Sequence, residues 1–224
     1  MIDTVVVISA QNTEGDILST DLKAHDCRVL QGIVGLKEAP AGSENIFVIN
    51  PTSDTSVEEI TKKLDYAVDM LVINLDYRPE GSRETISIGQ NYDSLLEAYN
   101  YNTVGPVRII KSFLPLLERG NGKRICVVTT VESSNNACFS INNYMNHTSK
   151  TALNMAMNIL FNDLRGKGYS FRLYCKNTKN PAESMKNFAV EYFLRDRSFE
   201  KGNPKHSDED RLALRSWEGR EIPW

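Results

Sequence analysis

Cysteine and histidine are scarce in this sequence, and neither is spaced for a disulfide framework or a metal site. The 224 residues include four cysteines without a Cys-x-x-Cys pair, and the three histidines are far apart. Small disulfide-bonded secreted proteins are denser in cysteine, and zinc proteins have more closely spaced metal ligands. We therefore expect buried free thiols in a reducing cytoplasm and no metal site. The residues concerned are Cys27, Cys126, Cys138, Cys175, His25, His147 and His206.

Long hydrophobic runs and an excess of positive charge are also lacking. The longest apolar stretches, residues 5–8 and 70–73, fall far short of the roughly 20 residues that cross a bilayer. No cationic segment leads into an apolar one at the N-terminus, so we expect neither secretion nor membrane insertion. With 26 basic and 29 acidic residues the formal net charge is −3, which argues against nucleic-acid binding. We expect a cytoplasmic protein.

The sequence does contain an alternation of short apolar runs with longer segments of helical periodicity. This alternation is typical of a parallel sheet covered by helices on both faces. Residues 1–195 are predicted to form one domain, and residues 196–224 a charged linker and a tail that can form a hairpin around Trp217–Gly219. Pro106 and Pro115 should bend the longest helix. The predicted strands are 4–9, 27–31, 45–49, 70–74, 124–130 and 169–175, and the predicted helices are 16–24, 55–66, 92–118, 144–166 and 181–194.

Three segments resemble the short-chain dehydrogenase/reductase family. Residues 150–168 match, without a gap, the family segment that begins at the catalytic Lys. Residues 101–105 are similar to its Asn-x-x-Gly motif, and residues 123–130 to the strand that ends in the catalytic Ser. The resemblance implies a single-domain, doubly wound α/β sheet of the Rossmann type. It also implies NAD or NADP as cofactor and a homo-oligomer that pairs through the helices at 92–118 and 146–166.

The cofactor motif of that family is eroded here. Its Thr-Gly-x-x-x-Gly-x-Gly turn lets backbone N–H groups approach the pyrophosphate at a helix N-terminus. The matching positions are Ser9, Ala10, Glu14 and Asp16, with Gly15 out of register. A carboxylate 4 Å from a phosphate charge costs about 4 kcal/mol at an effective dielectric of about 20. The acidic residues can instead complement the helix dipole.

Other positions on the same rim of the sheet depart from the family as well. The second strand ends in Gln31-Gly-Ile, without the acidic residue or Arg that would bind the ribose. The Asn-Asn-Ala-Gly run becomes Ile73-Asn-Leu-Asp76, and Pro-Gly becomes Lys176-Asn177. If a dinucleotide binds, the resemblance assigns its contacts to Ser9, Ala10, Gly15 and Asn74.

The catalytic residues are preserved only in part. Asn102 and Lys150 match the family's Asn and Lys, and Thr130 keeps a hydroxyl in place of Ser. Asn146 stands where the family has its proton-donating Tyr, and a carboxamide has no proton to exchange near neutral pH. Tyr144 is two positions away, about 200° around a helix, and can serve only if the helix begins after it.

Lys150 and the nearby His147 also have interpretations that involve no catalysis. Lys150 can balance the charge of Glu14, Asp16 or Asp76 rather than take part in catalysis. His147 can act as an acid or base near pH 7, but without a carboxylate to orient it a helical histidine is more often a surface residue.

The sequence supports two hypotheses. The first is a degenerate family member without ordinary NAD(P)-dependent hydride transfer, which needs no nicotinamide cofactor and acts as a non-catalytic oligomer subunit or binds another small molecule. The second is an NAD(P)-dependent oxidoreductase with an atypical site, built from Asn102, Thr130, Tyr144 and Lys150. Loss of the glycines together with the Tyr favours the first hypothesis.

Overall fold

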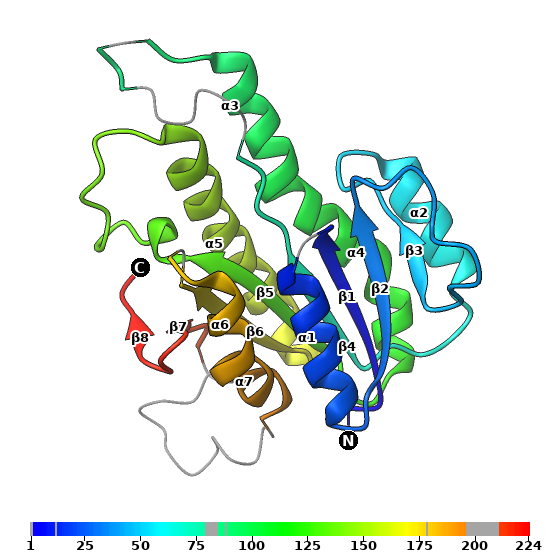
Figure 1. Cartoon of the computed structure of the whole chain (residues 1–224). Helices are drawn as coiled ribbons and strands as arrows, with labels where there is room; N and C mark the ends of the chain where they lie inside the picture. Colours follow the sequence, from blue (N-terminus) through cyan, green and yellow to red (C-terminus); the bar gives the residue numbers. More distant parts are fainter. Residues whose placement is uncertain (1, 12, 79–84, 88, 178, 196–210) are drawn as a thin grey trace.

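An eight-stranded sheet runs through the computed structural model, which describes residues 2–11, 13–78, 85–87, 89–177, 179–195 and 211–224 (Figure 1). The strand order is β3-β2-β1-β4-β5-β6-β7-β8. The pairs from β3 to β7 are parallel, and β8 is antiparallel to β7. The strands are β1 (Thr4–Ala10), β2 (Arg28–Val34), β3 (Ile46–Val48), β4 (Met70–Asn74), β5 (Arg124–Thr130), β6 (Ser170–Lys176), β7 (Leu214–Ser216) and β8 (Glu221–Ile222).

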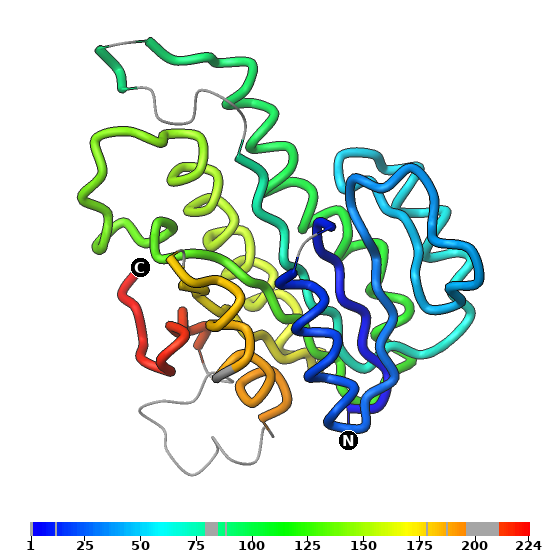
Figure 2. Tube along the Cα trace, viewed as in Figure 1, coloured from blue at the N-terminus to red at the C-terminus, as the bar shows by residue number. Residues whose placement is uncertain are grey.

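Helices cover both faces of this sheet (Figure 2). On one face the helical core residues come from α2, α4 and α5, and on the other from α1, the π-helical segment Met185–Ala189 and α7. Strands β4, β5 and β6 are buried along their whole length, which explains the continuous apolar runs at 70–73 and 125–128, whereas β6 also buries the polar residues Ser170 and Arg172. The helices are α1 (Thr13–Ala24), α2 (Asp54–Lys63), α3 (Tyr92–Tyr99), α4 (Gly105–Arg119), α5 (Tyr144–Leu164), α6 (Pro181–Ser184) and α7 (Val190–Leu194).

The long helix expected over 92–118 is divided in the structure. A π-helical turn, Asn100–Val104, separates α3 from α4. Pro106 has no N–H to donate to the carbonyl of Asn102, so the regular ladder is interrupted next to this turn. Pro115 lies inside α4. The predicted single helix is therefore interrupted near Pro106 by a change from α-helical to π-helical hydrogen bonding.

The tail contributes two strands to the sheet. β7 and β8 form the expected hairpin, in which Gly219 takes a φ of +79° at the turn. β7 also pairs in parallel with β6, which the sequence pattern does not predict. Leu212, Ala213 and Leu214 are buried there. The linker at 196–210 lies outside the described residues. Within the described ranges, no helix is long and apolar enough to cross a membrane.

Candidate functional site

The carboxyl ends of the parallel strands place several predicted site residues at one edge of the sheet. Ser9 and Ala10 end β1, Asn74 ends β4, Thr130 ends β5 and Lys176 ends β6. Open α/β sheets bind their ligands at this edge. These residues come together because β1, β4, β5 and β6 are consecutive in the sheet, although they are far apart in the chain.

A carboxylate from α1 extends across this edge. Lys176 Nζ lies 2.9 Å from Glu14 Oε2 and 3.3 Å from Asp76 Oδ2. Asn74 Nδ2 also donates to Glu14 Oε2, at 3.1 Å. Lys176 is 6% exposed, so these contacts are largely shielded from water. Glu14 thus ties the first turn of α1 to the ends of β4 and β6.

The ion pairs continue toward the start of α5. Lys150 is fully buried, donates to the carbonyl of Leu75, and lies 3.6 Å from Asp76 Oδ1. Arg78 joins Asp76, at 3.3 Å, to Glu132, at 3.2 Å. The group contains three cations and three carboxylates, so its formal charges cancel. We call this group the charge network, and its members are Glu14, Asp76, Arg78, Glu132, Lys150 and Lys176.

The charge network determines the ionisation of its central members. Burial by itself raises the pKa of Asp76, but attraction to Lys150, Lys176 and Arg78 outweighs burial and holds that pKa well below its ordinary value. Burial lowers the pKa of Lys150, and the attraction of Asp76 offsets only part of this effect. Asp76 is therefore the fixed negative charge around which the three cations are arranged.

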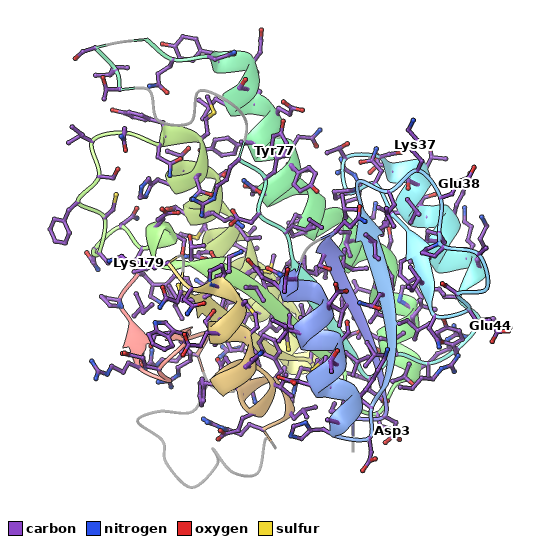
Figure 3. All side chains as sticks on the ribbon, in the orientation of Figure 1. Asp3, Lys37, Glu38, Glu44, Tyr77 and Lys179 are labelled. Atoms are coloured by element: carbon purple, nitrogen blue, oxygen red, sulfur yellow. The ribbon has the colours of Figure 1, made fainter. Side chains whose placement is uncertain are left out.

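Asn102 holds a loop in place in this structure. Its Oδ1 accepts the N–H of Tyr77 at 2.8 Å, and its Nδ2 donates to the carbonyl of Tyr77 at 2.9 Å and to Ser149 Oγ at 3.1 Å. Figure 3 labels Tyr77 beside α3. Asn102 therefore links the chain that follows β4 to α5, and its side chain is completely buried.

The remaining predicted catalytic residues are divided between two surroundings. Thr130 is fully buried and donates to Glu132 Oε2 at 3.4 Å. Asn146, at the family's Tyr position, also donates to Glu132 Oε2. Tyr144 is already part of α5, is 38% exposed and lines a cavity that also borders Glu132. Thus Asn146 faces the charge network, whereas Tyr144 faces the cavity.

The residues at the β1–α1 turn do not fit a dinucleotide pyrophosphate. Ser9 and Gly15 are buried, and Glu14 is held by Lys176 and Asn74. Asp16 is exposed and accepts from Gln31 Nε2 at 3.4 Å. Contrary to the expectation from the sequence, Glu14 is not a bare charge facing phosphate, because Lys176 neutralises it. A phosphate at this helix N-terminus would instead have to compete with Glu14 for the side chains of Lys176 and Asn74.

A cavity of about 510 Å³ lies on the outer side of α5. Its wall includes His147, whose Nδ1 is 2.7 Å from the carbonyl oxygen of Glu132 and 3.4 Å from Cys138 Sγ. Cys27, Cys126 and Cys175 are buried free thiols as expected, but Cys138 is only half-buried. His147 is half-buried too, and a backbone carbonyl orients it. The lining residues are Tyr99, Glu132, Asn135, Cys138, Ser140, Ile141, Asn142, Tyr144, His147, Thr148, Thr151, Ala152 and Met155.

Sequence reasoning missed three residues that matter here. Arg78 follows β4, Glu132 lies in the 3₁₀ turn Val131–Ser133 directly after β5, and Cys138 lies in the loop after that turn; no family motif marks them. Their only signal was charge or a thiol within loops that follow the carboxyl ends of strands. In the part of the chain that the structure describes, no group of three or more His, Cys, Asp or Glu residues is placed to hold a metal ion.

Similarity to curated proteins covers part of the chain. C-signal of Myxococcus xanthus is 33% identical over 79 residues, which are 35% of this chain and 48% of that protein. Short-chain dehydrogenase RED3 of Pyricularia oryzae is 24% identical over 135 residues, 58% of this chain and 48% of that protein. The chain thus spans about half the length of the curated relatives it matches. No protein-family model matches it.

Similarity to solved structures covers the whole chain. Carbonyl reductase Sniffer of D. melanogaster superposes with a TM-score of 0.76 at 15% identity, with 100% of both chains covered. NADPH-bound carbonyl reductase from chicken fatty liver gives the same TM-score, identity and coverage. At this identity the likeness concerns the fold.

Proposed function

We propose that this chain, which resembles curated short-chain dehydrogenases over part of its length and shares their fold, does not perform ordinary NAD(P)-dependent hydride transfer but binds another small molecule. The charge network is the observation that carries this proposal. It connects α1, the segment after β4, α5 and the end of β6 at the edge where the fold would hold a dinucleotide.

The electrostatics of the charge network support the proposal that no dinucleotide binds at this edge. A pyrophosphate at the N-terminus of α1 would have to separate Glu14 from Lys176 and Asn74. The released carboxylate would then lie beside phosphate charge, and one such pair at 4 Å costs about 4 kcal/mol at an effective dielectric of about 20. That energy corresponds to about a thousandfold in affinity.

The position of the missing Tyr also supports it. Asn146 is buried and donates to Glu132, so it serves the charge network and offers no exchangeable proton. The cavity on the outer side of α5 is the alternative binding site that we propose. Its volume of about 510 Å³ lies within the range of about 300–1,000 Å³ that is usual for small-molecule pockets.

A thermal-shift titration tests this proposal. NAD, NADH, NADP and NADPH at 1 mM should each leave the melting temperature of the full chain unchanged. A ligand at a hundred times its Kd adds about 2.7 kcal/mol to stability, a shift of several degrees at this size. Such a shift with any of the four would refute the proposal.

A matched variant tests the cause. Replacing Ala10, Glu14 and Asp16 together with Gly removes both carboxylates and leaves Lys176 paired with Asp76 alone. NADH or NADPH should then raise the melting temperature of the triple variant. If the triple variant is folded and still shows no shift, the barrier does not lie in Glu14 and Asp16, and Lys176 or Asp76 becomes the next residue to test.

An NAD(P)-dependent oxidoreductase with an atypical site is the second candidate. Asn102 and Lys150 occupy the family positions, and a neighbour of the same fold was solved with NADPH. This candidate requires dinucleotide binding by the wild type and carbonyl reduction that depends on Tyr144. Tyr144→Phe should abolish that activity, whereas Tyr99→Phe, at the same cavity, should retain it.

A further inference from the structure

Cys138 and His147 form a pair whose proton positions can be assigned from geometry. His147 Nδ1 lies 2.7 Å from the carbonyl oxygen of Glu132. A carbonyl oxygen only accepts, so Nδ1 must carry a proton. Cys138 Sγ lies 3.4 Å from the same nitrogen, and therefore it cannot donate its S–H there. The one proton on Nδ1 is directed mainly at the Glu132 carbonyl, so Cys138 Sγ can only be a second, longer acceptor of the same N–H, a position that a thiolate fills better than a thiol.

We propose that Cys138 and His147 form a thiolate–imidazolium pair, and that the cavity beside them binds apolar α,β-unsaturated carbonyl compounds by reversible covalent addition to Cys138. This proposal rests on the small-molecule role proposed above and names the class of ligand. The addition needs no cofactor, because it requires no oxidant or reductant.

The cavity suits an apolar electrophile. Its wall combines Ile141, Tyr144 and Met155 with Cys138 and His147. The other titratable groups on the wall are Tyr99 and Glu132, from the end of α3 and the loop after β5. The carboxylate of Glu132 is bound by Arg78 at 3.2 Å, so it does not act as a bare negative charge beside the thiolate.

Cys138, His147 and the ligand supply all the atoms, electrons and protons of the proposed addition. The thiolate sulfur attacks the β-carbon and forms a C–S bond, while the π electrons of the C=C bond move to give an enolate. The imidazolium then gives the proton on Nε2 to the α-carbon, because Nδ1–H stays on the Glu132 carbonyl. The products are a thioether and neutral His147. The reverse reaction uses His147 as base and releases the ligand.

The other three cysteines serve as internal controls. Cys27, Cys126 and Cys175 are 6%, 0% and 1% exposed. Burial raises the pKa of Cys126 to about 12 and also raises the pKa values of Cys27 and Cys175. A buried thiol that stays protonated is a poor nucleophile. Reaction of the native chain should therefore occur at Cys138.

The first measurement is the rate of N-ethylmaleimide addition between pH 6 and 8, followed by intact mass and peptide mapping. We expect one adduct, at Cys138. His147→Asn keeps an N–H donor for the Glu132 carbonyl but removes the charge, and it should slow the addition at pH 6.5 at least about tenfold. His25→Asn, at an exposed histidine, should react like the wild type. His147→Gln replaces His147→Asn if that variant unfolds.

The second measurement compares 3-nonen-2-one with 3-penten-2-one, which carry the same reacting group on a long and a short chain. Addition to native Cys138 should favour the longer enone about tenfold or more, since roughly two extra buried methylenes suffice for this preference. The guanidinium-unfolded chain should show no such preference.

Two results would overturn the inference. Equal rates of N-ethylmaleimide addition for the wild type and a folded His147→Asn variant would contradict the thiolate–imidazolium pair. Equal enone selectivity in the native and unfolded chains would contradict the proposed class of ligand. Both readouts are independent of dinucleotide binding. A rise in melting temperature with NADPH would therefore refute the proposed function. The rates of addition to Cys138 would still decide this inference separately.

Discussion

At the scale of single residues, Asp76 lies at the centre of the charge network. Asp76→Asn leaves Lys150 buried with only the carbonyl of Leu75, whereas Lys176 keeps Glu14 and Arg78 keeps Glu132. Breaking a buried pair on one side costs about 3–5 kcal/mol, so we expect a loss of that order in the free energy of unfolding. Denaturant unfolding measures it.

A double-mutant cycle separates pairing from burial in this case. Lys150→Met leaves Asp76 with two cations and should destabilise less than Asp76→Asn does. The double variant should be more stable than the sum of the two single losses predicts. Strictly additive losses would contradict this prediction. Asp163→Asn, in an exposed pair with Lys167, is the control and should change stability by less than about 0.5 kcal/mol.

Asp69 gives the chain a dependence on pH. Its carboxylate accepts the N–H groups of Asp3, Thr4, Asn121 and Gly122 at 2.7–3.2 Å. Burial raises the pKa of Asp69, but these backbone donors outweigh burial and lower it. A pKa lowered on folding stabilises the protein above the unfolded value of about 3.9.

The stabilisation from Asp69 should therefore be lost as pH falls below about 4, through its folded pKa. Asp69→Asn should reduce the free energy of unfolding at pH 7 and flatten the loss between pH 4 and pH 2. Urea unfolding at a series of pH values tests this. An Asp69→Asn curve parallel to that of the wild type at all pH values would show that other groups cause the acid sensitivity.

At the scale of elements, the turn between α4 and β5 depends on a glycine. A Cβ at Gly120 would lie 2.1 Å from the carbonyl oxygen of Val68, which is backbone just before β4. Backbone cannot move aside without disturbing the strand, so Gly120→Ala should destabilise by about 1–3 kcal/mol. Thermal unfolding measures the loss.

Gly166 is the matched control for this turn. It lies in a 3₁₀ turn after α5, and a Cβ there meets nothing within 4 Å. Gly166→Ala should be neutral or slightly stabilising, because it restricts the unfolded chain. Equal losses from Gly120→Ala and Gly166→Ala would mean that close contact with Val68 is not the cause.

At the scale of the whole molecule, we propose a homo-oligomer that pairs through the outer faces of α3 and α5. Leu96, Met155 and Ile159 are each more than half exposed on these helices, which pack against one another (Figure 1). The stripe of Leu153, Met157 and Leu164 is buried in the core, so it cannot provide the contact. An isologous pair would cover the exposed residues.

Met155→Glu combined with Ile159→Glu should convert the assembly to monomers without loss of helical content, because the charges would be buried at the contact. Light scattering during gel filtration reports the mass, and circular dichroism reports the fold. Lys63→Glu, on α2, should leave the mass unchanged. A monomeric wild type at micromolar concentration would contradict the proposal.

The sequence by itself determined most of the fold and part of the site. Parallel strands buried on both faces are continuous apolar runs, and helices carry a 3.6-residue pattern, so both were visible locally. Family spacing placed Asn102 and Lys150, and the erosion of the glycine turn was visible directly. These features depend on residues close together in the chain.

Only the tertiary structure decided what the site contains. Lys176 reaches Glu14, which is 162 residues away, because β6 ends at the same edge of the sheet as β1 and β4. The pairing of Cys138 with His147 depends on the path of the loop after β5, and the pairing of β7 with β6 on which strand edge remained open. Ion pairs and edge pairing follow from which elements become neighbours in space. No local pattern of apolar and polar residues records that information.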